Sequence, residues 1–211
     1  MLWSDPWLLA LRKPAGLLSQ PGLGPELADS LISRACRRWP EALLVHRLDR
    51  DTSGLILLAR DPATHRRLSA AFAERRIGKI YRARVWGVPA ARSGRIDQPL
   101  ARLSTRPPRY GVVPLGEGGK PALTRWRRLA DPAPAADRAS TLLLQPITGR
   151  SHQLRVHLAW LGHPVLGDPL YGADSAGADG SEPGLQLRAI GLRLRHPHTG
   201  RPLRLRCPGS P

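Results

Sequence analysis

The chain has 211 residues, with 33 lysines and arginines against 16 aspartates and glutamates, and a formal charge of +17. This length can bury a substantial core, and the charge points to nucleic acid as the partner. No run reaches the about 20 apolar residues of a membrane-spanning helix, and the N-terminus is not a signal peptide. Cys36 and Cys207 are too few for a disulfide framework. We therefore expect a cytoplasmic protein.

The first half of the chain predicts both strands and helices. Residues 7–11 are predicted as a strand, and residues 26–39 have the spacing of a helix that ends at Pro40. Two apolar segments, 43–45 and 55–59, predict a pair of strands around a charged turn. Asp61 followed by proline is typical of a helix start, with the aspartate as N-cap.

The second half predicts further strands, which share an alternation of apolar and polar residues: 79–87, 122–129, 140–145, 185–194 and 202–207. Residues 92–121 are expected to be mostly loop, and the connectors 130–139 and 173–184 to be flexible. A helix is predicted from Ser151 to Gly162. The pattern favours an α+β fold with a mixed, largely antiparallel central sheet and flanking helices and loops, in a single domain over residues 1–211.

The charged turn at residues 46–53 is the first candidate site. It holds two arginines and two carboxylates in the order Arg47, Asp49, Arg50 and Asp51. The flanking segments favour burial, where unpaired charge is costly. A charge cluster held between buried strands indicates a functional site.

Metal binding and phosphoryl transfer are two other chemistries that the residue types allow. The seven histidines do not have the spacing of metal ligands, and structural or RNA-contacting roles are favoured for them. Asp49 to Ser53 comes close to the nucleophile motif of haloacid-dehalogenase-type phosphotransferases. Its Thr52 is one position early, however, and the chain lacks the regular βαβ alternation of that fold. The phosphotransferase therefore stays a remote alternative.

A second informative stretch runs from residue 145 to residue 172. Thr148, Gly149 and Arg150 form a polar, basic turn at a predicted helix N-terminus, a natural position for an anion. Arg155 on the first turns of the helix could reach an acidic partner. The alternative is a capped surface helix with a solvated arginine.

Five motifs together resemble the RluA-type family of pseudouridine synthases: Lys13–Leu17, His46–Gly54, Lys79–Ala83, Thr148–Arg155 and Gly167–Gly172. The resemblance covers almost the whole chain in the right order. It is greatest for the compact form without an N-terminal S4 RNA-binding domain, a form that includes dual-specificity enzymes acting on 23S rRNA and tRNA stem-loops. Two positions depart from the family pattern: Arg12 replaces an asparagine, and Arg188 replaces a histidine.

The resemblance implies isomerisation of uridine to pseudouridine in structured RNA, without a cofactor or a metal ion. It assigns Asp49 as the catalytic carboxylate and Arg155 as the cation that keeps it ionised. Tyr81 is expected to pack against the target base and to relay a proton.

The resemblance also implies that the target base leaves its stack and that Arg47 fills the vacated place. Arg150 and His152 are assigned to RNA binding. The expected partner is rRNA, tRNA or both, and the expected state is a monomer; the modified uridine stays open. The second functional alternative is an RNA-binding or ribosome-assembly factor whose synthase activity is secondary or lost.

Overall fold

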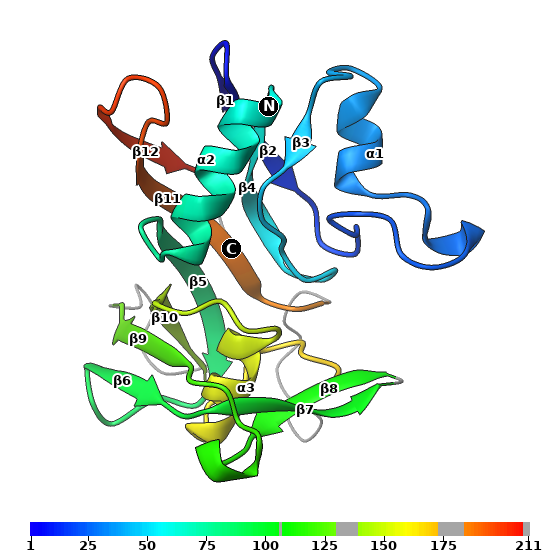
Figure 1. Cartoon of the computed structure of the whole chain (residues 1–211). Helices are drawn as coiled ribbons and strands as arrows, with labels where there is room; N and C mark the ends of the chain where they lie inside the picture. Colours follow the sequence, from blue (N-terminus) through cyan, green and yellow to red (C-terminus); the bar gives the residue numbers. More distant parts are fainter. Residues whose placement is uncertain (106, 130–138, 173–183, 209–211) are drawn as a thin grey trace. The chain divides into compact units, whose positions relative to one another are not determined.

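The computed structural model describes residues 1–105, 107–129, 139–172 and 184–208 (Figure 1). The chain divides into two compact units. Unit 1 contains Met1–Lys79 and the C-terminal segment from Arg188, and unit 2 contains Ile80–Leu187. The boundary falls inside one strand, β5 (Gly78–Trp86), whose first two residues belong to unit 1.

Unit 1 is built on a mixed sheet whose strands are β1 (Trp3–Ser4), β2 (Leu8–Lys13), β3 (Leu43–Leu44), β4 (Ser53–Ala59), β11 (Leu187–Arg195) and β12 (Pro202–Arg206). β4 is central, because β2 and β3 pair with it antiparallel and β11 pairs with it parallel. β12 continues the sheet antiparallel to β11. Six of the seven residues of β4 are buried, which explains its almost continuous apolar sequence.

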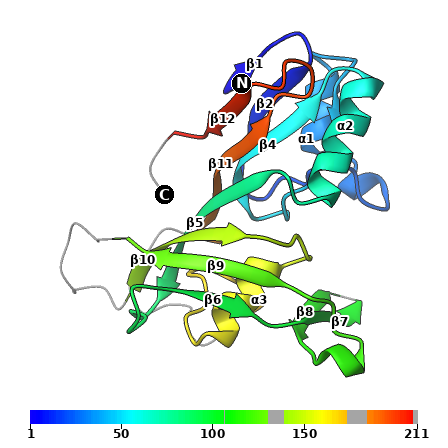
Figure 2. The ribbon, with the colours of Figure 1, turned by 60° about the vertical axis from the view of Figure 1, so that its left-hand side comes forward.

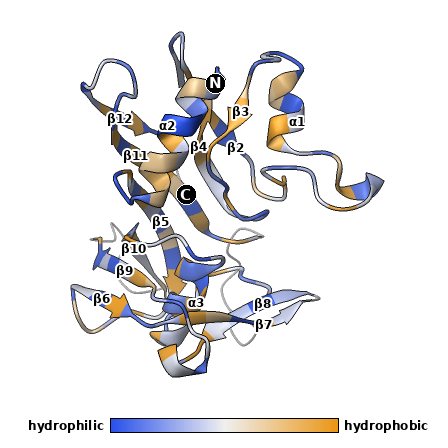
Figure 3. Ribbon diagram, in the orientation of Figure 1, coloured by the Kyte–Doolittle hydropathy of each residue, from blue (hydrophilic) through white to orange (hydrophobic). Residues whose placement is uncertain are grey.

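Helix α2 (Pro62–Ala73) packs against the sheet of unit 1 and carries hydrophobic and hydrophilic residues in alternating bands (Figure 3). Its buried Leu68 and Ala71 join a core cluster with Leu8, Leu55 and other apolar residues of the strands. The side chain of Asp61 accepts a hydrogen bond from the backbone of Thr64, so the predicted N-cap is confirmed.

Unit 2 contains a four-stranded antiparallel sheet in the order β5, β10 (Ala139–Pro146), β9 (Leu123–Arg128) and β6 (Ser93–Asp97). One face of the sheet carries Ala83, Leu142 and Leu144, which pack with Leu154 and Leu158 of helix α3 (Gln153–Trp160). A separate hairpin is formed by β7 (Leu100–Thr105) and β8 (Pro108–Val112). The predicted α+β class with a mixed, largely antiparallel sheet is confirmed.

The prediction that residues 92–121 are mostly loop was wrong. β6, β7 and β8 lie in this region, followed by a short 3-10 helix at Leu115–Glu117. These strands expose most of their side chains, and Ile96 and Leu100 are among their few fully buried residues. Such strands are held by backbone pairing, so their sequence lacks the apolar alternation that predicts a strand.

Two predicted helices have different boundaries in the structure. The segment 26–39 is divided into a 3-10 helix at Pro25–Leu27 and α1 (Leu31–Cys36), because Ser30 adopts an extended conformation and its hydroxyl caps α1 at Ser33. Helix α3 begins at Gln153 and not at Ser151, because His152 has a left-handed backbone with φ 53°.

The flexible connectors predicted at 130–139 and 173–184 lie almost wholly outside the described residues. The terminal pair of predicted strands is confirmed as β11 and β12. In the described parts of the chain, no helix is both long enough and apolar enough to cross a membrane.

Candidate active site

The loop between β3 and β4 in unit 1 carries Asp49, the predicted catalytic carboxylate. The Asp49 side chain is half-buried and Arg47 is exposed, whereas Leu48 and Thr52 are buried. The buried side chains of Leu48 and Thr52 anchor the loop, and the two predicted functional residues, Arg47 and Asp49, stay accessible. Among the described residues, the Asp49 carboxylate accepts no hydrogen bond.

Lys13, at the end of β2, holds this loop from inside. Its side chain is fully buried, and its ammonium group donates to the carbonyl oxygens of Arg50 at 2.6 Å, Leu17 at 2.7 Å and Pro14 at 2.9 Å. All three N–H groups are therefore used. Burial lowers the Lys13 pKa to about 8, against the attraction of Asp51 and Asp49, which raises it.

Ser19 fixes the same loop from a second side. Its hydroxyl donates to the Leu48 carbonyl at 2.7 Å and accepts from the Leu48 amide at 3.0 Å. Within the loop, the Thr52 amide donates to the Asp49 carbonyl at 3.2 Å. The backbone on either side of Asp49 is thus tied to the body of unit 1.

His46 closes the N-terminal end of the loop as a neutral side chain. Its Nε2 accepts a hydrogen bond from the Leu57 amide of β4 at 2.9 Å, and its ring stacks on Phe72 with centroids 4.5 Å apart. Burial and the nearby charge of Lys79 lower the His46 pKa to about 3. An Nε2 atom that accepts cannot carry a proton, so the geometry and the pKa agree.

The C-terminal end of the loop meets β11. Gly54 has φ 113° and lies so close to Ala189 that an added Cβ would sit 2.1 Å from the Ala189 carbonyl oxygen. Any side chain here would clash with backbone, so glycine is required. Arg188, which replaces the family histidine, is buried beside this contact and donates to Cys207 Sγ at 3.2 Å and to the Pro208 carbonyl at 2.9 Å.

In unit 2, Gln153 organises the turn before α3. Its side-chain oxygen accepts from the Thr148 hydroxyl at 2.7 Å and from the Arg150 amide at 3.0 Å. Its side-chain nitrogen donates to Leu123 and Thr124 of β9, both at 3.0 Å. Gln153 therefore fixes the predicted basic turn to the sheet, although no sequence pattern assigns it this role.

Arg155 forms a buried bidentate ion pair with Asp168. Its Nε and Nη2 donate to the two carboxylate oxygens at 2.8 and 2.6 Å, and the side chains are 3% and 0% exposed. The Asp168 Oδ1 atom also accepts from the amides of Leu170 and Tyr171. The Arg155 guanidinium carbon lies 5.0 Å from the centroid of the Tyr171 ring, and this cation–π contact further restricts the position of the guanidinium group.

The other predicted residues of unit 2 lie near this pair or on the sheet. His152 Nδ1 is 2.8 Å from the Tyr171 hydroxyl. Arg150 is exposed and donates to the Pro121 carbonyl. Tyr81 lies on β5, half-buried against the core cluster under α3. Unit 2 thus links Arg155 and His152 through Tyr171, and unit 1 places Arg47 and Asp49 on one loop.

Sequence reasoning missed Lys13, Gln153 and Asp168 as supporting residues. Each lies inside a motif, but at least one of its partners is remote in sequence: Arg50 for Lys13, β9 for Gln153 and Arg155 for Asp168. No local pattern could identify these contacts. The fully buried His157 has a structural role, between Thr124 of β9 and the Gln98 carbonyl. Within the described ranges, no group of three or more His, Cys, Asp or Glu side chains could hold a metal ion.

Comparison with known proteins supports the resemblance seen in the motifs. The family model of RNA pseudouridylate synthases matches residues 8–160. The chain is 42% identical over 210 residues to the dual-specificity RNA pseudouridine synthase RluA of Escherichia coli K12, covering 100% of this chain and 93% of that protein. It is 42% identical over 207 residues to RluA of Yersinia pestis, covering 98% and 97%.

Solved structures agree with these relatives. Human RNA pseudouridylate synthase domain containing 1 superposes with a TM-score of 0.81 at 30% identity, covering 99% of this chain and 82% of that chain. Human RNA pseudouridylate synthase domain containing 4 gives a TM-score of 0.75 at 26% identity, covering 98% and 87%. None of these matches supports the phosphotransferase or the assembly-factor alternative. The chain therefore belongs to the RNA pseudouridylate synthase family and is an RNA pseudouridine synthase of the RluA type.

Proposed function

We propose that this enzyme isomerises uridines in 23S rRNA and tRNA stem-loops, with Asp49 as the catalytic carboxylate. The observation that carries this proposal is the loop around Asp49. Lys13 and Ser19 fix its backbone, while the Asp49 carboxylate accepts no hydrogen bond from any described residue. A half-buried carboxylate on a fixed loop is suited to act on a substrate, because its position is set before the substrate binds.

Asp49 must be ionised to act as a nucleophile or as a base. The ammonium group of Lys13 attracts its charge within unit 1. We assign Arg155 as the second cation that favours the ionised carboxylate in the reacting complex. The bidentate pair with Asp168 supports this role, because it fixes the plane and direction of the guanidinium group.

The isomerisation breaks the N1–C1′ bond of uridine, turns the base, and joins C5 to C1′. The proton displaced from C5 moves to N1, so atoms balance without a cofactor. Tyr81 would pack against the base and relay this proton through its hydroxyl. Arg47, which is exposed beside Asp49, would fill the place that the flipped uridine leaves.

Arg150 and His152 would contact RNA phosphates or bases. Arg150 is exposed at the turn before α3, and His152 lies at the start of the helix. The choice of 23S rRNA and tRNA as substrates comes from the resemblance of the motifs to the compact form of the family, and the full-length similarity to enzymes named for dual specificity supports it. We further propose that residues 1–211 act as one catalytic domain, as a monomer, in the cytoplasm and without a metal ion.

The test is release of tritium from 23S rRNA and tRNA transcripts labelled with [5-³H]uridine. The wild-type enzyme should release tritium, and Asp49→Ala should lower the rate by at least about 10⁴-fold, because the reacting group is removed. Asp51→Ala is the matched control, since it removes a carboxylate from the same loop, and it should keep most of the activity. Turnover by Asp49→Ala at the wild-type rate would refute the assignment.

A further inference from the structure

The outer face of the sheet in unit 2 carries arginines from three strands. Side chains alternate along each strand, and one set packs on α3 while the other set faces outward. The outward set contains Arg82 and Arg84 of β5, Arg125 and Arg127 of β9, and Arg95 of β6. We call these five residues the arginine face.

The pairing of the strands brings like charges together on this face. Arg95 lies directly opposite Arg125. Arg127 and Arg82 are both opposite Leu143 of β10, one on each side of it. Like charges directly opposite one another destabilise a sheet. The directly opposite pair Arg95 and Arg125 costs stability, and with the arginines on each side of Leu143 it indicates a functional surface.

Few acidic or hydrogen-bonding groups of unit 2 neutralise the charge of the arginine face. Within the described residues, Arg95, Arg125 and Arg127 make no hydrogen bond or ion pair. The Nε atom of Arg82 is buried and has no hydrogen-bond partner among the described residues. Asp97 is the only acidic residue in β5, β6, β9 and β10, and it lies at the end of β6. The exposed guanidinium groups of Arg95, Arg125 and Arg127 are therefore available for an external anion.

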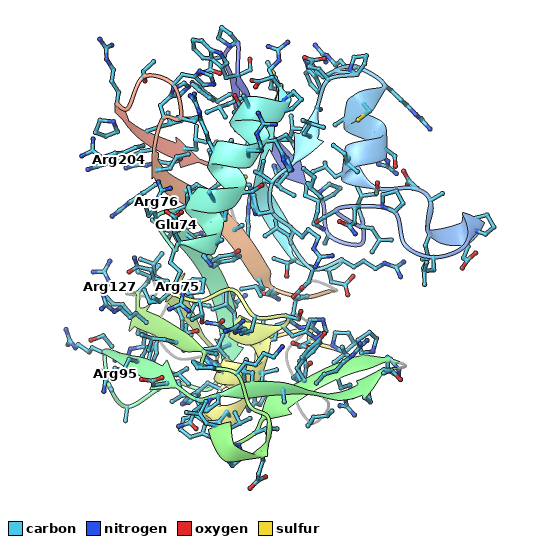
Figure 4. The ribbon with its side chains drawn as sticks, in the orientation of Figure 1. Glu74, Arg75, Arg76, Arg95, Arg127 and Arg204 are labelled. Carbon is cyan, nitrogen blue, oxygen red and sulfur yellow. The ribbon has the colours of Figure 1, made fainter. Side chains whose placement is uncertain are left out.

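The arginine face is separate from the proposed active-site residues of unit 2. Tyr81 lies on the other face of β5, with the core cluster that packs on α3. Figure 2 shows β6, β9 and β10 in front of α3, so no described helix of this unit covers the outward face. Arg95 and Arg127 lie on the side of the sheet away from α3 (Figure 4).

We propose that the arginine face binds the phosphate backbone of RNA outside the target stem-loop. Exposed arginines on a sheet suit phosphates, to which most protein–nucleic acid hydrogen bonds are made. A protein partner is less suitable, because a stable interface needs an apolar centre, whereas Leu143 in the middle of this face has an arginine on each side. This proposal rests on the proposed RNA substrate and adds that the natural substrate extends beyond one hairpin.

The test compares a long rRNA fragment with a minimal stem-loop that contains the same target uridine. Replacing Arg95, Arg125 and Arg127 together by glutamine should raise KM for the long RNA about tenfold and leave kcat unchanged. The stem-loop kinetics should not change. The slope of log K against log salt for the long RNA should decrease in magnitude by about 2, because about three phosphate contacts are lost.

Two further variants separate this effect from general charge and from misfolding. Replacing Arg34, Arg37 and Arg38 of the α1 region by glutamine removes the same charge elsewhere and should not change the salt slope. Replacing the three face arginines by lysine keeps the charge and should retain most of the affinity. A glutamine variant whose salt slope equals that of the α1 control would overturn the proposal.

Other outcomes are equally decisive. If the stem-loop loses as much kcat/KM as the long RNA, the arginines serve the target site and the proposal is wrong. The glutamine variant could also keep the wild-type salt slope for the long RNA and lose affinity for an acidic protein. The partner would then be a protein, and the proposal would also be wrong. Binding measured in the Asp49→Ala background tests the surface without catalysis, so a failure of the proposed reaction would not be mistaken for a failure of this surface.

Discussion

Lys13 shows how one side chain sets the conformation of the loop that carries Asp49. Its ammonium group is fully buried, and all three of its donors are bound to backbone carbonyls. Burial lowers its pKa from 10.5 to about 8, so the charged form is disfavoured in the folded protein. Burial of this charge costs stability. We explain its presence by the three hydrogen bonds of Lys13, which hold the loop in one conformation.

The variant Lys13→Met should therefore affect activity more than stability. Relief of the burial cost partly offsets the loss of three hydrogen bonds, so we expect the free energy of unfolding to decrease by about 2 kcal/mol. The value of kcat should decrease about 100-fold, because a small shift of a catalytic group is costly. Urea denaturation and tritium release measure the two effects. Lys120→Met, at an exposed lysine, is the control; wild-type kcat in Lys13→Met would contradict the proposed role.

His46 makes the stability of the protein depend on pH in the acid range. Its pKa is about 3 in the folded state, against the ordinary 6.5, because desolvation of the ring and the nearby charge of Lys79 disfavour the protonated form. Between these values the unfolded chain binds more protons than the folded protein, so stability decreases as the pH falls from 6.5 towards 3. The charged form would also lose the acceptor for the Leu57 amide.

We therefore expect the wild type to lose about 1–2 kcal/mol of stability relative to His46→Gln when the pH falls from 6.5 to 5. Glutamine keeps an acceptor for the Leu57 amide but does not titrate. Denaturant unfolding of both proteins at the two pH values gives the difference. Comparison with the variant is needed because burial also lowers the pKa of His157, which titrates in both proteins. Parallel pH dependence of the two proteins would show that His46 does not contribute.

At the scale of elements, α3 and the turn before it form a fixed support for Arg155. Gln153 ties the turn to β9, and Asp168 and Tyr171 fix the guanidinium group. A buried ion pair contributes little net stability, but removal of one partner leaves an uncompensated charge. The pair is therefore better explained by orientation of Arg155 than by stability.

This explanation predicts that stability and activity can be separated. Asp168→Asn should reduce the free energy of unfolding by about 3 kcal/mol, because the Arg155 charge loses its partner. The double variant Arg155→Met with Asp168→Leu removes both charges and should recover part of that stability. Its kcat should nevertheless stay at least 100-fold below wild type, if Arg155 acts on the reacting complex. Thermal unfolding and single-turnover kinetics of the three proteins provide the test, and an active double variant would rule out the assigned role.

Elements with a strong local signal could be predicted from sequence. β4 was identified by its apolar run, and α2 by the Asp61 cap and Pro62. β6 to β8 were missed because their exposed side chains carry no apolar alternation. The break between Leu27 and Leu31 was missed because the helical spacing of apolar residues continues across it.

The candidate site residues depend on motifs. Asp49, Tyr81 and Arg155 each lie in a short motif of the family that the chain resembles, and their catalytic roles stay predictions. The supports of the loop were not predictable, since Ser19 contacts Leu48 across 29 residues and Lys13 contacts Arg50 across 37. Contacts of this kind depend on the folded arrangement and leave no local signal.

At the scale of the whole molecule, the charge of +17 agrees with an RNA substrate. Arginines on the sheet of unit 2 account for part of this charge, and we propose a use for them separate from Tyr81 and Arg155 of the same unit. Binding should therefore depend steeply on salt, whereas the chemical step should not. The central claim remains the Asp49-dependent conversion of uridine to pseudouridine.

Mapping of pseudouridine in total RNA tests that claim most directly. Cells lacking the gene would be complemented with the wild-type chain, with Asp49→Ala or with the control Asp51→Ala, at matched protein levels. We predict that specific pseudouridines in 23S rRNA and tRNA disappear in the deletion strain, return with wild type and Asp51→Ala, and stay absent with Asp49→Ala. Restoration of the same pseudouridines by Asp49→Ala would contradict the account.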